Sequence, residues 1–173
     1  VKQKGCVSCH DPHASASADF MLKDSDPALC LECHKPDKKG FKTRHMNYTV
    51  SNSRCTSCHN SHGSNTRGII FDDMHEPVAK KECDKCHEGP ASKTPLAIRS
   101  KGVELCRGCH NEMIAEMFGK DHLHWPLADK TGCLNCHNAH AAKQKHLLSG
   151  PVVDVCGKCH TDTVELQEIS RNN

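Results

Sequence analysis

Cys133-Leu-Asn-Cys-His-Asn-Ala-His140 contains the five-residue pattern that decides the structure of this chain, Cys-x-x-Cys-His. The pattern occurs seven times in 173 residues and uses all 14 cysteines, so none is left for a disulfide bond or a free thiol. The copies, numbered motif 1 to motif 7 in chain order, are Cys6, Cys9 and His10; Cys30, Cys33 and His34; Cys55, Cys58 and His59; Cys83, Cys86 and His87; Cys106, Cys109 and His110; Cys133, Cys136 and His137; and Cys156, Cys159 and His160.

Each copy has the chemistry of a covalent attachment site for a c-type haem. Two thiols three positions apart can form thioethers with the two vinyl groups at one porphyrin edge, and the histidine that follows can bind the iron. A zinc site or a thioredoxin-like redox pair needs no histidine after every second cysteine, which disfavours both alternatives. The sequence therefore predicts seven haem c groups. The predicted proximal ligands are His10, His34, His59, His87, His110, His137 and His160.

The composition predicts a structure that forms around these haems. Four phenylalanines, one tyrosine and one tryptophan are too few aromatic residues for an ordinary hydrophobic core. With about 25 residues per haem, the porphyrins must supply much of the apolar material. We expect a single haem-packed domain over residues 1–173, with short α-helices, long irregular loops and little or no β-sheet. The best helix candidate is Val103–Phe118, and Gly119 is expected to end it.

Three segments read alike and indicate doubled units. In each, a histidine follows the proximal histidine by three residues, and a second motif comes later: His13 precedes motif 2, His62 motif 4 and His140 motif 7. The expected repeat units are therefore 1–44 (motifs 1 and 2), 45–95 (motifs 3 and 4) and 121–173 (motifs 6 and 7). Motif 5 stands alone in 96–120.

The CxxCHxxH segment followed by a second CxxCH resembles the doubled-CxxCH class of multihaem cytochromes c. The resemblance runs from about Val1 to Thr161. Its relatives include the periplasmic and outer-membrane electron conduits of metal-reducing bacteria and small electron donors to nitrite reductase. The resemblance implies a role in electron transfer.

Eight histidines lie outside the motifs, enough to give each of seven irons a second imidazole ligand. These candidate distal ligands are His13, His45, His62, His75, His122, His124, His140 and His146. The resemblance suggests that His13, His62 and His140 serve motifs 2, 4 and 7. His45 and His124 precede motifs 3 and 6 by 10 and 9 residues, a short loop that could fold back over those haems.

Three assignments stay open. His75, in His-Glu-Pro-Val, resembles His124, in His-Trp-Pro-Leu, and competes with His62 for motif 4. Motifs 1 and 5 have no obvious local donor, and the candidates for them are His75, His122 and His146. Because only five residues precede motif 1, its sixth ligand must come from later in the chain, from a neighbouring subunit or from upstream sequence. Methionine ligands, which would raise a haem's potential, are a further alternative.

An iron with two imidazole ligands has no open position for a substrate, so we expect an electron-transfer conduit and no catalytic residues. One alternative is a multihaem reductase of nitrite, hydroxylamine or sulfite with one open haem. Another is a subunit of a polymeric cytochrome filament, motivated by the missing donor of motif 1.

Charge and targeting signals limit the partners. The polypeptide carries a formal charge of +2, but propionates and ferric cores would bring the total to about −5 oxidised and −12 reduced. The lysines are dispersed, which gives no case for nucleic-acid binding, and no stretch approaches the roughly 18 apolar residues of a membrane span. Residues 1–5 are not a signal peptide. We expect a processed or excised chain that is periplasmic or extracellular, with redox protein partners and, as an alternative, homo-oligomers.

Overall fold

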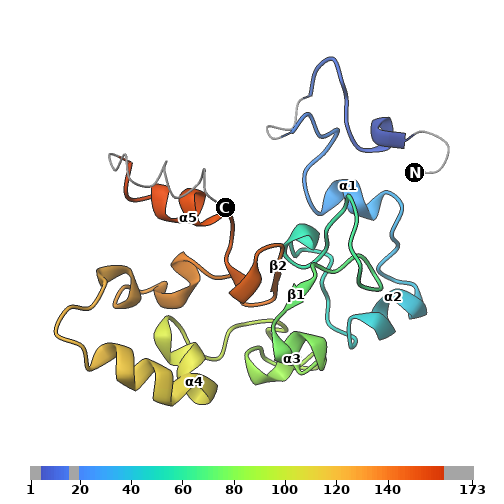
Figure 1. Ribbon diagram of the computed structural model, residues 1–173. Coiled ribbons are helices and arrows are strands. Elements are labelled where there is room, and N and C mark those ends of the chain that lie inside the picture. Colours follow the sequence, from blue (N-terminus) through green and yellow to red (C-terminus); the bar gives the residue numbers. More distant parts are fainter. Residues whose placement is uncertain (1–4, 16–19, 162–173) are drawn as a thin grey trace. The chain divides into compact units, whose positions relative to one another are not determined.

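The computed structural model describes residues 5–15 and 20–161 (Figure 1). By contacts between residues, the chain forms two compact units, Val1–Thr56 and Ser57–Asn173. The boundary falls inside motif 3, so each unit has attachment motifs of its own.

The first unit is built from short helices and turns. Motif 1 lies on the 3-10 helix η1 (Gly5–Ser8), and motif 2 on α1 (Ala28–Leu31). α2 (Lys39–Arg44) follows, and η2 (Cys55–Ser57) begins at the end of this unit. These helices have no more than six residues, too few to be stable in isolation, so packing against other groups must hold them.

The second unit contains a two-stranded sheet and one long helix. Its elements in chain order are β1 (Asp73–Met74), α3 (Glu76–Ala79), η3 (Cys83–Lys85), α4 (Val103–Phe118), η4 (Trp125–Leu127), η5 (Gly132–Asn135), β2 (Ala141–Ala142), η6 (Lys145–Leu147) and α5 (Val152–Gly157).

The two strands pair antiparallel, with Asp73 opposite Ala142 and Met74 opposite Ala141. A ladder of two residues per strand is too short to be stable alone. It is held from one side by Asp73, whose carboxylate accepts a hydrogen bond from the backbone N–H of Leu147 at 2.7 Å. The ladder therefore joins segments that lie almost 70 residues apart in the sequence.

The predicted helix Val103–Phe118 is confirmed with the same bounds as α4, and Gly119 is its C-cap. Gly119 donates its backbone N–H to the carbonyl of Ala115 at 3.0 Å, which closes the last turn. The backbone departs from helical geometry at His110 (φ −110°, ψ 32°), the proximal histidine of motif 5. The helix therefore bends where the iron ligand is placed.

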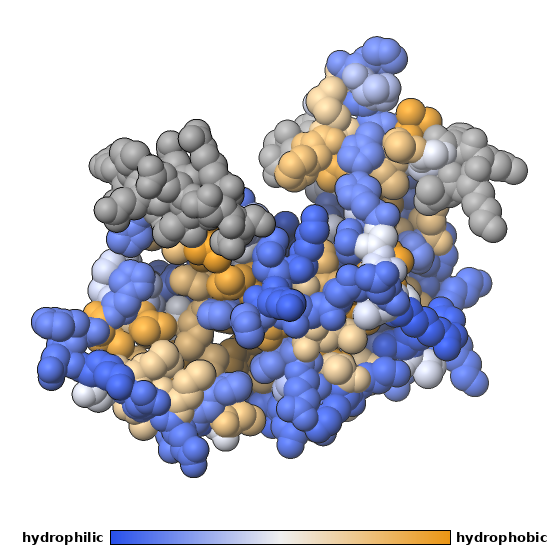
Figure 2. All heavy atoms as spheres, viewed as in Figure 1, coloured by the Kyte–Doolittle hydropathy of each residue, from blue (hydrophilic) through white to orange (hydrophobic). Residues whose placement is uncertain are grey.

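The described part of the chain has a thin protein core. Its buried apolar residues are Tyr48, Ile114, Ala141, Ala142 and Val155, and Ile114 is the one large side chain among them that is completely buried. Large apolar side chains are exposed instead: Phe20 is 83% exposed and Trp125 65%. Figure 2 shows apolar atoms at the surface among hydrophilic ones. Such exposure is expected where apolar side chains surround a porphyrin.

Short helices, mostly irregular connections and a two-stranded sheet confirm the predicted fold class. The expected single domain and its four repeat units at 1–44, 45–95, 96–120 and 121–173 stay a prediction.

Candidate haem-binding sites

The attachment motifs adopt two local structures. Motifs 1, 3, 4 and 6 start on or within the 3-10 helices η1, η2, η3 and η5, whereas motifs 2, 5 and 7 lie at α1, α4 and α5. In both kinds, the N–H of the proximal histidine bonds to the carbonyl of the first cysteine, as from His87 to Cys83 at 2.9 Å and from His160 to Cys156 at 3.0 Å. Motifs 1, 2, 4, 6 and 7 are therefore each wound into a single turn, and motif 5 lies within α4.

The second cysteine of a motif belongs to the same turn. The backbone N–H of Cys33 donates to the carbonyl of Cys30 at 3.3 Å, and that of Cys136 donates to the carbonyl of Cys133 at 3.2 Å. Cys33 is exposed, and Cys136 is partly buried. Both cysteines of a motif thus lie on one turn, as two thioethers to a single porphyrin edge require. Covalent attachment of haem at Cys33, Cys136 and the other 12 cysteines stays a prediction.

In the four 3-10 motifs, the proximal histidine donates its Nδ1–H to a backbone carbonyl nine or ten residues further on. The pairs are His10 to Phe20 at 2.7 Å, His59 to Gly68 at 2.7 Å, His87 to Leu96 at 2.7 Å and His137 to His146 at 2.8 Å. Because a carbonyl can only accept, the proton is on Nδ1, and Nε2 carries the lone pair that can bind iron. A bond of this kind fixes the ring and strengthens the ligand.

A repeated backbone device positions these carbonyls. Each of the four histidines forms an isolated antiparallel bridge with an apolar residue: Leu22, Ile70, Ile98 or Leu148. Near each carbonyl, a non-glycine residue has a positive φ, such as Ile69 (φ 53°) and Leu96 (φ 67°). This conformation costs roughly 1 kcal/mol or more for a residue with a side chain. The antiparallel bridge beside each of these residues must therefore stabilise the positive φ.

Three pairs of histidine rings have their centres at nearly the same separation. Ring centres are 5.9 Å apart for His87 and His140, 6.1 Å for His75 and His110, and 6.0 Å for His124 and His160. The ring planes are nearly parallel, within 16° to 23°. Each pair joins the proximal histidine of motif 4, 5 or 7 to a histidine outside the motifs.

The gap has the size that a shared iron requires. A histidine nitrogen binds a metal ion at about 2 Å, and it lies roughly 1 Å from the centre of its own ring. Two rings on opposite sides of one iron therefore have centres about 6 Å apart. The residues fit bis-histidine haem ligation at motifs 4, 5 and 7.

His75 and His124 are presented by the same local structure. Each is the N-cap of a short helix, α3 or η4, and has extended backbone geometry (ψ 137° and 116°) with a proline at the second helical position. Proline is tolerated in the first turn of a helix, where its missing N–H has no intrahelical partner, and the histidine precedes that turn as the N-cap. Both histidines face a proximal histidine of a helical motif. The shared His-x-Pro sequence was the signal for this likeness.

His140 is half-buried. Burial lowers its pKa below the ordinary value, and the neighbouring His87 and His75 lower the pKa further. Its backbone N–H donates to Asn138 Oδ1 at 2.9 Å. A lowered pKa keeps the ring neutral, which is the form that binds iron.

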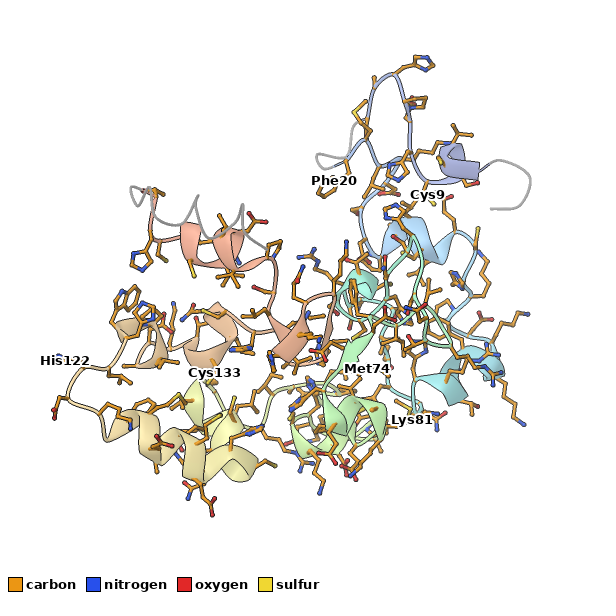
Figure 3. The ribbon with its side chains drawn as sticks, in the orientation of Figure 1. Cys9, Phe20, Met74, Lys81, His122 and Cys133 are labelled. Atoms are coloured by element: carbon orange, nitrogen blue, oxygen red, sulfur yellow. The ribbon has the colours of Figure 1, made fainter. Side chains whose placement is uncertain are left out.

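The other candidates lie elsewhere. The side chain of His13 is 93% exposed and 3.9 Å from Asp11. His45 donates Nδ1–H to the carbonyl of Phe41 at 2.9 Å, so its Nε2 carries the lone pair, and the backbone N–H of His62 donates to Asn60. His122 is exposed on the loop after α4 (Figure 3). His146 is also exposed, and its backbone has a left-handed conformation (φ 58°).

These neighbours differ from those that the sequence suggested. His62 or His75 was expected at motif 4, but the structure brings His140 to His87. His140 was expected at motif 7, and His124 occupies that place. For motif 5, whose donor was open, the structure places the ring of His75 beside that of His110, and ligation of an iron there stays a prediction. Sequence spacing suggested local partners, whereas His87 and His140 are 53 residues apart.

Thiols of successive motifs adjoin. Cys30 and Cys55 are hydrogen-bonded, and with a carboxylate oxygen of Asp26 their sulfur atoms lie within 4.8 Å of one another. Burial, followed by the bond to Asp26, raises the pKa of Cys55 to about 12. Cys106 and Cys133 form an equivalent contact, and burial followed by the neighbouring Cys133 raises the pKa of Cys106 to about 11. Each thiol belongs to an attachment motif, so these contacts bring together two predicted haem attachment sites.

Within the described ranges, no helix combines the length and the apolar character that a membrane crossing needs.

Comparison with known families agrees with this chemistry. The family described as "Doubled CXXCH motif" matches residues 1–39, 45–74, 75–115 and 124–165. No curated protein matches the chain. Since the matched segments cover most of the sequence, the chain belongs to the doubled-CXXCH family. It is a multihaem c-type cytochrome of the electron-transfer kind.

Proposed function

We propose that this chain is an electron-transfer conduit that carries electrons through seven closely packed c-type haems, most of them with two histidine ligands. The observation that carries the proposal is the set of three ring pairs with centres 5.9 to 6.1 Å apart. Two strong-field imidazoles fill both axial positions of an iron and leave no site for a substrate. Each bound haem then supplies a one-electron ferric–ferrous couple.

The chain's own residues keep these centres oriented and close together. The Nδ1–H bonds of four proximal histidines hold the imidazole planes. Cysteines of successive motifs interact electrostatically, as between Cys9 and Cys30, Cys58 and Cys83, or Cys86 and Cys109. Because each thiol marks one haem edge, this order supports an electron path that follows the sequence of the motifs.

The setting of the conduit follows from covalent haem attachment. We infer a periplasmic or extracellular location, redox proteins as partners and acceptors outside the cytoplasm. No nucleic-acid partner and no membrane span belong to this proposal. A filament of identical subunits is the alternative assembly, and dilution of the holoprotein during size measurement would separate it from a monomer.

Mass and spin state test the proposal together. Intact-mass measurement of the mature protein should show seven haems on the polypeptide. Low-temperature electron paramagnetic resonance of the oxidised protein should then account for nearly all irons as low-spin, bis-histidine haem. A high-spin iron that binds carbon monoxide in the native protein would instead favour the reductase with an open haem.

A further inference from the structure

We propose that the β1–β2 ladder supplies the sixth ligands of two haems, His140 to the iron of motif 4 and His75 to the iron of motif 5. The two haems would then be clamped as a pair by a single piece of backbone. This inference deepens the proposed function and rests on its bis-histidine haems, but it assigns particular ligands to particular irons.

The register of the ladder brings the two histidines together. Since Met74 is opposite Ala141, the next pair outward is His75 and His140. The backbone N–H of His75 donates to the carbonyl of His140 at 3.0 Å. The ring of His75 donates Nδ1–H to the carbonyl of Ala139, also at 3.0 Å, and this bond leaves Nε2 as the iron-binding nitrogen.

From this shared position, the two rings meet different motifs. The ring of His140 faces His87, and the ring of His75 faces His110, at centre distances that fit one iron in each gap. A one-residue slip of one strand would turn the histidine on that strand to the opposite face and separate the two rings. The register of two short strands therefore controls two metal sites at once.

Burial and hydrogen bonds stabilise the position of the ladder. Ala141 is completely buried and Ala142 is 5% exposed, so both residues of β2 pack against other groups. The carboxylate of Asp73 is engaged by the N–H of Leu147. Asn138, two residues before His140, donates its side-chain amide to the carbonyl of Ser57 at 3.2 Å. These contacts come from three separate segments of the second unit.

The same pairing appears in the family match. One matched segment, 75–115, contains motifs 4 and 5, whereas motif 3 stands alone in 45–74. Motif 4 is of the 3-10 kind and motif 5 of the helical kind, the same order as in motifs 6 and 7. We therefore pair motif 4 with motif 5, in place of the pair of motifs 3 and 4 that the sequence suggested.

Proton nuclear magnetic resonance of the reduced native protein tests the assignment without any variant. Axial imidazole protons are shifted strongly by the ring current and identify a ligand of low-spin haem. We expect nuclear Overhauser contacts from His140 to the haem bonded to Cys83 and Cys86, and from His75 to the haem bonded to Cys106 and Cys109. Contacts from His140 to the haem at Cys156 and Cys159 would overturn the proposal.

Two single variants give an independent count of the haems that lose a sixth ligand. His140→Ala and His75→Ala should each convert one low-spin haem to a carbon monoxide-binding, high-spin haem, and the double variant should convert two. His124→Ala is the matched control: it should also convert one haem, that of motif 7. Unchanged spectra in His140→Ala or His75→Ala would refute the ladder assignment. A native protein that already contains several high-spin haems would instead count against the proposed function.

Discussion

Asp26 joins the attachment turns of motifs 2 and 3. Its carboxylate accepts hydrogen bonds from the backbone N–H groups of Cys55 and Thr56 at 2.8 and 2.9 Å, and from the hydroxyl of Thr56 at 2.8 Å. Burial opposes ionisation, but these bonds together outweigh it, and the pKa of Asp26 lies below its ordinary value of 3.8. A negative charge therefore lies beside Cys30 and Cys55, where two predicted attachment sites meet.

Asp26→Asn should raise the reduction potentials of the haems of motifs 2 and 3. The negative carboxylate stabilises the more positive ferric state, and its removal at a distance of several ångströms should shift these potentials upward by roughly tens of millivolts. Spectroelectrochemical titration of both proteins checks this expectation. Asp24→Asn, an exposed aspartate two residues earlier, is the matched control and should change little. Equal titration curves for Asp26→Asn and the native protein would contradict the assigned role.

Asp26 should also make stability depend on pH. Its lowered pKa means that the ionised carboxylate stabilises the folded chain fully above the ordinary value of 3.8, and that this contribution is lost as pH falls through the lower folded value. In urea titrations, the native protein should be more stable than Asp26→Asn at pH 6, by about 1 kcal/mol. The difference should shrink below about pH 4. A difference that stays constant down to pH 2 would argue against the ionised form.

At the scale of elements, the left-handed turn after motif 4 controls the ring of His87. Leu96 has φ 67° and provides the carbonyl that accepts the Nδ1–H bond. Proline locks φ near −65°, whereas glycine adopts positive φ without strain. Leu96→Pro should therefore displace the carbonyl and raise the potential of the haem of motif 4, and Leu96→Gly should preserve it. Potentiometric titration compares the two, and similar potentials in both variants would contradict the role of this turn.

Ile114 should account for much of the packing of α4. It is completely buried, in a chain with very little other protein core. Ile114→Ala should lower the free energy of unfolding by about 3 kcal/mol through lost contacts and a cavity. Glu116→Gln is the control and removes one partner of an exposed ion pair with Lys120 on the same helix. It should change the free energy of unfolding by less than about 1 kcal/mol. Denaturant unfolding of both variants measures the difference, and equal losses would show that α4 is not anchored at Ile114.

The sequence predicts helix α4 but not the β1–β2 ladder, and the difference has a physical reason. The bounds of α4 could be predicted because helix formation depends on near neighbours: apolar residues recur between Val103 and Phe118, and a glycine follows. The neighbour of His87 could not be predicted, because His140 is brought beside it by a ladder between two strands that lie far apart in the sequence. Two-residue strands leave almost no periodic signal. The family resemblance suggested His62 for motif 4, with His75 as its competitor, whereas long-range pairing of the strands brings His140 beside His87.

At the scale of the whole molecule, motifs 1 to 3 and motifs 4 to 6 have the same organisation. Cys83, Cys106 and Cys133 follow Cys6, Cys30 and Cys55 by 77, 76 and 78 residues. Both triplets run 3-10, helical, 3-10, and in both the second and third motifs meet through a pair of thiols. The chain thus reads as a three-motif module repeated in tandem, followed by motif 7.

This repeat predicts a role for His62. It precedes its counterpart, His140, by 78 residues and occupies the same place after a proximal histidine. His62→Ala should therefore convert one low-spin haem to high spin, as His140→Ala is expected to do. Electron paramagnetic resonance of the oxidised variant provides the count, with intact mass as the control for complete haem loading. A fully low-spin spectrum would show that the modules differ in their ligands.

The long span between His87 and His140 also has a consequence for biosynthesis. The chain is made from its N-terminus, so motif 4 can receive its haem before the residues around Ala139 have emerged. During that interval, the iron would have one open position, accessible to oxygen, peroxide or carbon monoxide. Completing the last fifth of the chain would close it. A cytochrome truncated before Asn138 would thus be a gas-binding protein, and each addition of chain would make it less reactive.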